Sequence, residues 1–328
     1  MNQRRTLLRS AAATALLAAS PLRAQQPGRS WRIGSVYVAT SATTKPFEES
    51  FLAGLADLGF VAGRNLVYEV RNCDGDAARL PAAIDELLAL KPDLLVGIEQ
   101  VARVMKSKTT AIPIVLTVSS DPVAAGLVKS LRQPGGNVTG NASLDGPMLV
   151  KQVELFAELL PRMTKMAMLT DPGVPAADSV DAEVRAAAKT KHISLLTYRV
   201  PDRAALDRAF AEMERQRPDA LLGGMQSGLI FSNLPQIFAE AARLRIPVSA
   251  SAAAANTAPA LFSYGVNLLH EFRRAAGAAA RILKGANSGD LPIEQPTRFE
   301  LVLNLKTAKA LGIKIPQSAL IRAERVIE

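Results

Sequence analysis

The sequence predicts an α/β protein of two similar lobes, each built on a doubly wound parallel sheet, joined by a hinge of several strands. Three observations carry this prediction. Short β-branched runs alternate with Ala- and Leu-rich segments of helical period, as in βα units. The order of these segments occurs twice along the chain. A tail of helix, linker and strand follows, which allows the chain to return to the first lobe and cross once more to the second.

The beginning of the chain has the composition of an export signal rather than of a folded domain. Residues 1–24 combine a basic start at Arg4, Arg5 and Arg9 with an Ala- and Leu-rich run and a small residue, Ala24, at the end. The segment predicts export by the general secretory route or, from the paired arginines, by the twin-arginine route. We therefore expect a periplasmic protein.

Charge and cysteine content exclude several classes of protein. Removing the signal and its four arginines lowers the formal net charge from +9 to +5, and no basic block with interleaved aromatic residues follows. We therefore expect no nucleic-acid partner. Cys73 is the single cysteine of the 328 residues, so no internal disulfide can form. No later apolar stretch has the length of a membrane span.

The first half of the chain, from Trp31, predicts three strand–helix units and a fourth strand. The runs WRIGSVYV and NLVYEVR are rich in β-branched and aromatic residues, and Gly59 ends the first helical segment. The expected strands are 31–38, 65–71, 91–98 and 112–118, and the expected helices are 46–59, 77–90 and 101–109.

The second half repeats this order. Its expected strands are 165–171, 193–200, 217–224 and 246–250, and its expected helices are 175–189, 202–216 and one that ends with 240–245. Two dipeptides recur at matching places, with offsets of 126 and 134: Pro92-Asp93 with Pro218-Asp219, and Ile112-Pro113 with Ile246-Pro247. Similar order at similar spacing predicts two lobes of one design.

The tail sets the expected domain boundaries. It consists of a strand over 260–267, a long helix over 268–285, a proline-broken linker and a strand over 298–304. This order predicts a first lobe of residues 29–138 plus 268–292, and a second lobe of residues 139–267 plus 293–328.

A glycine-rich loop, QPGGNVTGN at 133–141, stands where the first lobe ends. It has two interpretations, a phosphate cradle or a bend between the lobes. No Lys-Ser/Thr follows and no strand precedes it in the right place, so the bend is favoured. In the bend interpretation, Val-Thr-Gly crosses between lobes as an extended segment.

Signatures of catalysis and metal binding are absent from the sequence. His192 and His270 are the only histidines, and Arg274 stands where a zinc-protease motif needs its second histidine. Gly224–Gly228 resembles a nucleophile elbow, but its Ser227 is one place late. We therefore expect no enzyme, no metal and no cofactor.

Ligands of open parallel sheets bind outside the carboxyl ends of the strands, and between two such lobes this places them in the cleft. Hydroxyls, amides and helix N-termini there can bind a carboxylate, and an acid can bind an ammonium group. For Asp121 the alternative is a helix N-cap, because Pro122 follows it. The candidate ligand-binding residues are Thr40, Ser41, Glu99, Gln100, Ser119, Asp121, Asp171, Gln226, Ser251 and Tyr264.

Several long blocks resemble a known family, the substrate-binding proteins of ABC transporters described as tryptophan/tyrosine uptake components. The most specific are FLAGLADLGFVAGRNLVYEVRNCDGDAARLPAAIDELLALKPDLLV, IPIVLTVSSDPVAAGLVKSLRQPGGNVTG and LKGANSGDLPIEQPTRFELVLNLKTAKALGIKIPQSALIRAERVIE, with SYG between the last two. The resemblance implies a type I periplasmic-binding fold, a small organic solute as ligand and an ABC permease as partner. It also implies that the glycine-rich loop leads into the first interlobe crossover. We expect a monomer.

The sequence departs from the family pattern at the predicted pocket. The small Gly/Thr/Pro/Ala loop usual after the third strand is Ile98–Val101 here, the usual Asn-Pro is Asp171-Pro172, and Val266 replaces a proline after SYG. A bulkier, more acidic rim suits a ligand with a positive group, or narrows the cleft. Two alternatives stay open: an exported ligand sensor of the same fold, and an α/β enzyme.

Overall fold

The computed structural model describes residues 29–143, 145–223, 227–251 and 259–328. Residues 31–328 form one unit of the chain, and the description below concerns that unit. The expected signal at 1–24 and the candidate Gln226 lie outside the described residues.

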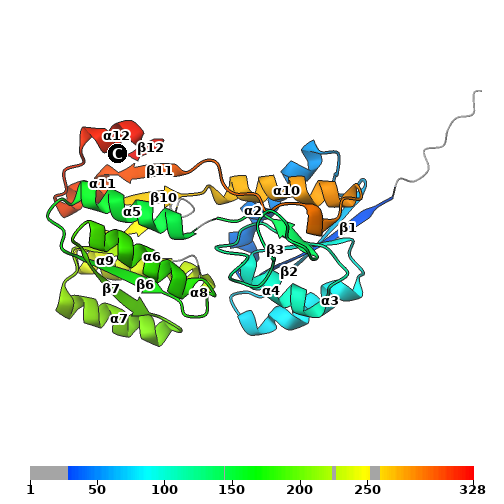
Figure 1. Cartoon of the computed structure of the whole chain (residues 1–328), viewed down its shortest axis with the longest axis horizontal. Helices are drawn as coiled ribbons and strands as arrows, with labels where there is room; N and C mark the ends of the chain where they lie inside the picture. Colours follow the sequence, from blue (N-terminus) through cyan, green and yellow to red (C-terminus); the bar gives the residue numbers. More distant parts are fainter. Residues whose placement is uncertain (1–28, 144, 224–226, 252–258) are drawn as a thin grey trace, which may run out of the picture. The chain divides into compact units, whose positions relative to one another are not determined.

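The first lobe is built on a five-stranded parallel sheet in the order β2-β1-β3-β4-β5 (Figure 1). Its β-branched runs form strands close to the predicted ranges. The fifth strand consists of Val-Thr-Gly from the glycine-rich loop, which pairs with the fourth strand instead of crossing between lobes. The strands are β1 (Trp31–Tyr37), β2 (Leu66–Asn72), β3 (Leu94–Gly97), β4 (Ile114–Leu116) and β5 (Val138–Gly140).

Gly140 closes β5 at a position that only glycine fits. Its φ is +127°, and a Cβ there would lie 2.2 Å from the carbonyl oxygen of Leu116. The close approach of β5 to β4 thus explains one glycine of the loop.

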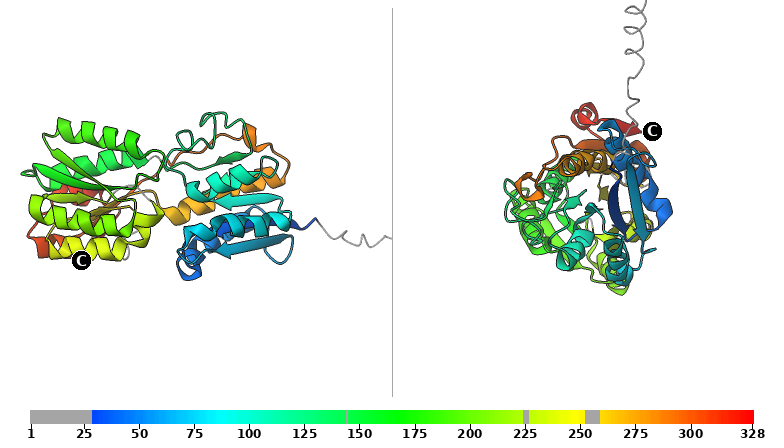
Figure 2. Two further views of the ribbon diagram at one scale, coloured as in Figure 1. Left: turned by 90° about the horizontal axis from the view of Figure 1, so that it is seen from below. Right: turned by 90° about the vertical axis from the view of Figure 1, so that its right-hand side faces the viewer.

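Helices cover both faces of this sheet (Figures 1 and 2). The first of them begins at Ser41, ahead of the predicted start, and contains Pro46. The long helix from the tail returns and packs beside it, at Gly54, where a Cβ would lie 2.6 Å from Arg273 O. The helices are α2 (Ser41–Asp57), η1 (Ala77–Arg79), α3 (Leu80–Ala89), α4 (Glu99–Lys108) and α10 (Leu268–Leu283).

Alternation along the strands divides the apolar side chains of the first lobe between two cores. Leu94 and Val96 of β3 point to a core with Phe51 of α2 and Phe272 of α10. Leu95, between them, points to a second core with the side chains of α3 and α4. Both faces of β3 are therefore buried, as in a doubly wound sheet.

The second lobe contains two sheets that an isolated bridge between Leu221 and Val248 connects. The order is β7-β6-β8 in one and β12-β11-β10-β9 in the other. β11 is antiparallel to β10, so this lobe departs from an all-parallel sheet where the tail returns. The strands are β6 (Lys165–Thr170), β7 (Ser194–Arg199), β8 (Ala220–Leu222), β9 (Ser249–Ala250), β10 (Phe262–Gly265), β11 (Glu300–Asn304) and β12 (Arg325–Ile327).

The helices of the second lobe also enclose two cores. Met166 and Met168 of β6 face a core with Phe156, whereas Ala167 and Leu169 face a core with the α7 and α9 side chains. The helices are α5 (Asp145–Leu159), α6 (Ala177–Thr190), α7 (Arg203–Gln216), α8 (Gly228–Ser232), α9 (Leu234–Arg243), α11 (Leu305–Leu311) and α12 (Gln317–Arg322). The short helix η3 (Ser288–Asp290) lies in the first lobe, beside β5.

The hinge between the lobes consists of several extended segments. One follows β5, one joins β10 to α10, and one precedes β11. The first and third lie side by side, because Ala142 N donates to Glu294 O at 2.9 Å and Glu294 N donates to Gly140 O at 2.8 Å. Asn141 Nδ2 also donates to the carbonyl oxygen of Glu271 on α10, at 2.9 Å.

Candidate functional site

Three predicted site residues meet at the carboxyl edge of the first sheet. Glu99 opens α4 directly after β3, and Ser119 and Asp121 follow β4, the neighbouring strand. Ser119 Oγ donates to Glu99 Oε2 at 2.7 Å, and the backbone N–H of Asp121 donates to the same oxygen at 3.3 Å. Parallel strands place these groups together because their carboxyl ends share one edge of the sheet.

A second carboxylate, not singled out by the sequence analysis, lies beside this group. Asp145 opens α5 just after the first crossover and is 2% exposed. Ser120 Oγ donates to its Oδ2 at 2.6 Å, and Ser143 Oγ donates to its Oδ1 at 2.7 Å. The Ser143 N–H in turn donates to Ser119 O at 2.6 Å. We call Glu99, Ser119, Ser120, Ser143 and Asp145 the serine–carboxylate cluster.

The position of Asp145 in the sequence could have indicated that it belongs to the candidate site. An acid in the first turn of the helix after the glycine-rich loop is placed at the start of the second lobe, where the hinge meets the strand ends.

The surroundings of Glu99 in the cluster oppose its ionisation beside Asp145. Burial raises the pKa of Glu99 above its usual range, the hydrogen bonds from Ser119 and from the Asp121 and Ser120 backbone lower it, and the charge of Asp145 raises it further. Two carboxylates close together disfavour ionisation of both. The cluster therefore favours either a proton or a cationic group of a ligand.

Asp121 has a local role as well. Its Oδ1 accepts from the N–H groups of Val123 and Ala124, at 2.9 and 3.0 Å. These bonds cap a turn and not a helix, because residues 122–126 form turns. The alternative of a helix N-cap at Asp121 was therefore wrong, because a turn and not a helix follows Pro122.

Thr40 and Ser41 lie at the start of α2 and are exposed. Thr40 Oγ1 pairs with Thr43 Oγ1 at 3.1 Å, and no hydrogen bond in the described part of the chain joins either residue to the serine–carboxylate cluster. Both hydroxyls lie at a helix N-terminus, where a ligand carboxylate is favoured.

An aromatic group lies close to α2, between that helix and α10. The rings of Phe47 and Phe272 stack with centroids 5.1 Å apart, and Tyr37 lies 6.4 Å from Phe272. Tyr37 ends β1 at the carboxyl edge of the sheet, so these rings belong to the same end of the lobe as the cluster.

Gln100 is exposed in the first turn of α4 and faces the second lobe. Its Oε1 lies 3.2 Å from the place that a Cβ on Gly228 would occupy, at the start of α8. This approach brings a first-lobe candidate against a glycine of the second lobe.

The second-lobe candidates occupy separate places. Asp171 follows β6 and accepts from Gly173 N at 2.8 Å, which forms a local turn. Ser251 follows β9 and lines a small cavity of about 20 Å³ together with apolar side chains of α8 and α9. Among the described residues, therefore, no hydrogen bond joins Asp171 or Ser251 to the serine–carboxylate cluster.

A buried glutamine organises the strand ends near Ser251. Gln152 of α5 accepts from Ser249 Oγ at 2.7 Å and donates to Tyr264 O at 2.8 Å. Ser249 Oγ also accepts from Gly223 N at 3.2 Å. This network fixes β8, β9 and β10 where the second lobe faces the hinge.

Tyr264 lies on the side of β10 that faces the second-lobe core. Its ring stacks on Phe299 with centroids 5.8 Å apart, and the ring of Phe262, on the same side of the strand, packs against Phe156. Burial raises the pKa of the Tyr264 hydroxyl. Among the described residues, the Tyr264 side chain therefore contacts the second-lobe core and Phe299.

Ser227 of the elbow-like motif has a structural role. Ser227 Oγ accepts from Ile230 N at 3.1 Å and caps α8, while residues 224–226 of the elbow-like motif lie outside the description. Among the described residues no group of three or more His, Cys, Asp or Glu side chains could hold a metal ion. No helix of the described chain is long and apolar enough to cross a membrane.

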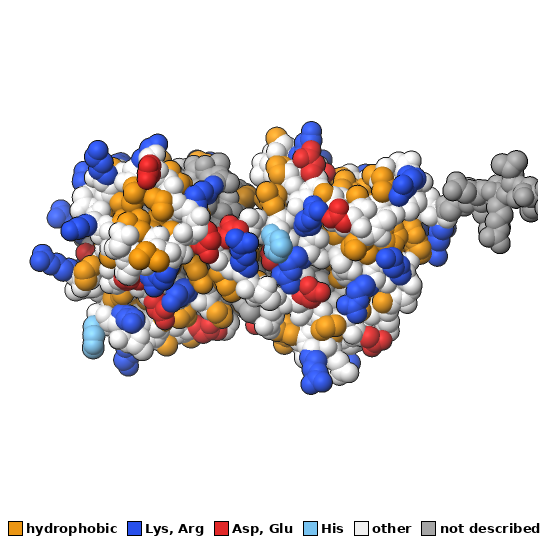
Figure 3. All heavy atoms as spheres, turned by 90° about the horizontal axis from the view of Figure 1, so that it is seen from above, with side chains coloured by type: hydrophobic (Ala, Val, Ile, Leu, Met, Phe, Trp, Pro, Cys, Tyr) orange, Lys and Arg blue, Asp and Glu red, His pale blue; other side chains and the backbone are white. Residues whose placement is uncertain are grey.

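On the face shown in Figure 3, basic side chains are interspersed with acidic and apolar ones. This face therefore carries no continuous area of one sign, which a nucleic-acid surface would need.

Comparison with known families decides the classification. The family described as ABC transporter substrate binding protein matches residues 37–327. The chain belongs to this family. Its fold is that of the type I periplasmic-binding proteins, as predicted, and the family consists of substrate-binding proteins and not of enzymes.

Individual relatives support the same classification. A tyrosine-binding protein of Clostridioides difficile (strain R20291) is 26% identical over 274 residues, which cover 81% of this chain and 76% of the relative. The crystal structure of a conserved domain protein from Vibrio cholerae has a TM-score of 0.84 and 27% identity, over 91% of this chain and 100% of that chain. The structure of an ABC domain in complex with L-Trp, from Streptococcus pneumonia, has a TM-score of 0.83 and 26% identity over the same shares.

Proposed function

We propose that this substrate-binding protein is the periplasmic component of an ABC importer. It binds a small organic solute in the cleft between its lobes and delivers it to an inner-membrane permease. Residues 1–24 direct export, and the lobes comprise 29–138 plus 268–292 and 139–267 plus 293–328. The protein acts as a monomer, without a metal or cofactor.

The observation that carries the proposal is the serine–carboxylate cluster at the carboxyl edge of the first sheet. This edge is where open α/β sheets bind ligands, and in a two-lobed protein it faces the cleft. The cluster lies directly beside the first crossover, through Ser143 and Asp145. A ligand that contacts it is therefore placed where lobe closure is transmitted.

The ligand class follows from the charges at this edge. An amino acid offers an ammonium group for Glu99 and a carboxylate for the N-terminus of α2, at Thr40 and Ser41. The relatives named above include a tyrosine-binding protein and a complex with L-Trp, which supports an aromatic amino acid or a similar amine.

Ligand binding shifts the population of the protein from the open form to the closed form. A ligand stabilises the closed form only through contacts that the open form lacks, so it must touch both lobes. On the second lobe, Asp171, Gln226 and Ser251 remain our candidates for these contacts.

The test begins with small molecules released from the purified mature protein by denaturation and identified by mass spectrometry. Saturable thermal stabilisation by the released compound, and by tryptophan or tyrosine, supports the proposal. X-ray scattering then measures closure. No released compound and no stabilisation by any amino acid would refute the ligand class, and an unchanged radius of gyration with bound ligand would refute closure.

Delivery is tested separately from binding. Where a permease gene lies beside the gene of this protein, transport of the ligand by membranes that contain that permease should require the protein. Transport that proceeds equally without it would leave a binding protein that serves a sensor.

A further inference from the structure

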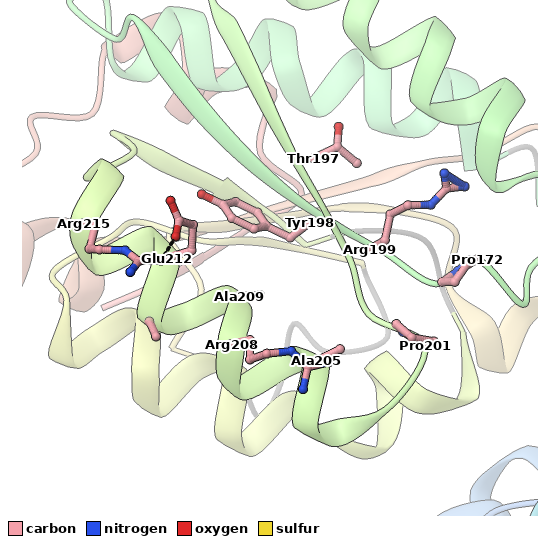
Figure 4. A pocket seen from close by; sticks show the side chains of 11 residues that line it. Pro172, Thr197, Tyr198, Arg199, Pro201, Ala205, Arg208, Ala209, Glu212 and Arg215 are labelled. Atoms are coloured by element: carbon pink, nitrogen blue, oxygen red, sulfur yellow. Dashed lines mark hydrogen bonds and ion pairs between the residues drawn. The ribbon is translucent and has the colours of Figure 1, made fainter.

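An open groove of about 670 Å³ lies on the second lobe, between the edge of β7 and the helix α7 (Figure 4). Thr197, Tyr198 and Arg199 of β7 form one side of it, and Arg208, Glu212 and Arg215 of α7 form the other. It shares no residue with the serine–carboxylate cluster, so the proposed function does not account for it.

The strand beside the groove is the edge of its sheet. β7 pairs with β6 and has no other strand neighbour among the described residues. Ser194 N donates to Thr164 O and Val200 N donates to Thr170 O, so even-numbered residues of β7 direct their backbone groups toward β6. In a parallel ladder the alternate residues then direct theirs outward.

One of the outward backbone groups of β7 already has a hydrogen-bond partner. Arg185 Nη1 donates to the carbonyl oxygen of Leu195, at 3.2 Å, which agrees with the outward direction of the odd-numbered residues. The backbone groups of Thr197 and Arg199 point the same way and border the groove. They offer the pattern that an added strand needs.

The groove has an apolar floor and a basic rim. Ala205 and Ala209 of α7 lie under Tyr198, whose hydroxyl is buried with no hydrogen-bond partner in the described part of the chain. Burial raises the pKa of this hydroxyl.

The charged side chains of the rim leave a positive excess. Arg199 bonds Asp178 of α6. Arg215 bonds Glu212 (Figure 4). Arg208 is exposed and has no bonded partner among the described side chains. With both of these pairs neutral overall, Arg208 supplies the positive excess of the groove.

We propose that this β7–α7 groove binds an extended acidic peptide segment of a partner protein, which adds to the sheet as a strand beside β7. The outward backbone groups of Thr197 and Arg199 bind its main chain. The side chains of the segment that point toward α7 lie over the alanine floor, and the acids among them pair with Arg208.

A second copy of this chain fits the groove less well. Pairing of two β7 edges would bring the same arginines together, and like charges at such an edge oppose self-association. An acidic segment meets no such repulsion.

The probe is a fluorescein-labelled peptide, EVDVEVDV, with QVSVQVSV as its neutral counterpart, titrated by fluorescence polarisation against the full mature protein. The acidic peptide should bind at least about tenfold more tightly than the neutral one, and high salt should weaken it. Equal binding of the two peptides, or none up to about 1 mM protein, would overturn the proposal.

Variants locate the binding. R208E should weaken binding of the acidic peptide by about tenfold or more. R203E reverses the charge of an exposed residue on the same helix, outside the groove, and should change the affinity for the peptide little. Equal losses in both variants would show nonspecific attraction and overturn the groove assignment. Circular dichroism and melting temperature confirm that each variant is folded.

Strand addition is tested at the backbone. T197P removes both the side-chain hydroxyl and the outward N–H of residue 197 and should abolish binding. T197V removes only the hydroxyl and keeps the N–H, so it should bind the peptide like the wild type. Hydrogen exchange should show protection of the Thr197 and Arg199 amides by the peptide. Binding without protection, or a concentration-dependent dimer abolished by T197P, would overturn the proposal in favour of a surface contact or of self-pairing.

Discussion

Arg274 Nη2 donates to Glu294 Oε2 at 3.0 Å and so ties the long helix α10 to the third interlobe segment. The same guanidinium bonds both carboxylate oxygens of Glu271, at 3.0 and 2.9 Å. Glu271 is 2% exposed, so its carboxylate depends on this arginine for its hydrogen bonds. Through the Glu271 carbonyl, which accepts from Asn141, the first segment joins the same assembly.

Removal of this arginine should strongly destabilise the protein. Arg274→Ala leaves the Glu271 carboxylate buried without a partner, and loss of one member of a buried pair costs about 3–5 kcal/mol. Urea unfolding measures the loss, and Arg281→Ala on the exposed side of α10 is the control. A loss no larger than that of the control would show that water compensates Glu271.

Gly140 provides a test of why the glycine-rich loop has its composition. Gly140→Ala places a Cβ at φ +127° and 2.2 Å from Leu116 O, so we expect a loss of about 3 kcal/mol or more in unfolding free energy. Gly136→Ala, in the same loop, meets nothing within 4 Å and should change stability little. Equal stability of the two variants would show that β5 can move away from β4.

The element order and the family could be predicted from the sequence because they rest on periodicity and on long blocks. The first and last residues of the helices and strands were harder to predict. Pro46 suggested a helix start, yet the fold places it within α2, and Asp121-Pro122 suggested a helix where only a turn forms. In both places tertiary packing decides what a local proline signal leaves open.

The candidate site was accessible only in part. Glu99 and Ser119 each follow a strand of a parallel sheet, so strand order brings them together. Asp145 joins them through the course of the hinge. Its place in the first turn of the helix after the glycine-rich loop was a signal in the sequence, but the serines that it bonds depend on the fold. Tyr264 stands at the expected strand end, but the alternation of β10 turns it toward Phe156 and Phe262, a direction that depends on which face the helices cover.

The raised pKa of Glu99 predicts a specific dependence of stability on pH. Because burial raises the pKa in the folded protein above its value in the unfolded chain, the folded state binds this proton more tightly. The stabilisation is complete below the unfolded-state value, near 4.5, and is lost as the pH rises through the folded-state value.

Glu99→Gln, which cannot ionise, isolates this contribution. The stability of the variant relative to wild type should increase from about pH 4 upward and level off once Glu99 is ionised in the folded protein. Unfolding in urea at a series of pH values measures the difference. Glu49→Gln, which replaces an exposed acid on α2, is the control for the loss of one carboxylate. A constant difference between Glu99→Gln and wild type across this range would contradict the raised pKa.

Ligand binding should show the opposite trend with pH at the same residue. An ammonium group beside Glu99 favours the ionised carboxylate, so the affinity for a cationic amine should increase as the pH rises through the pKa of Glu99. Glu99→Gln should weaken binding of such a ligand at neutral pH by about tenfold or more and abolish this pH dependence, since a lost charge-assisted hydrogen bond costs about 1.5–3 kcal/mol. Isothermal titration with the ligand released from the protein measures both effects. The matched Glu49→Gln variant should bind like wild type, and a Glu99→Gln variant that does the same would assign the recognition of the amine to another residue.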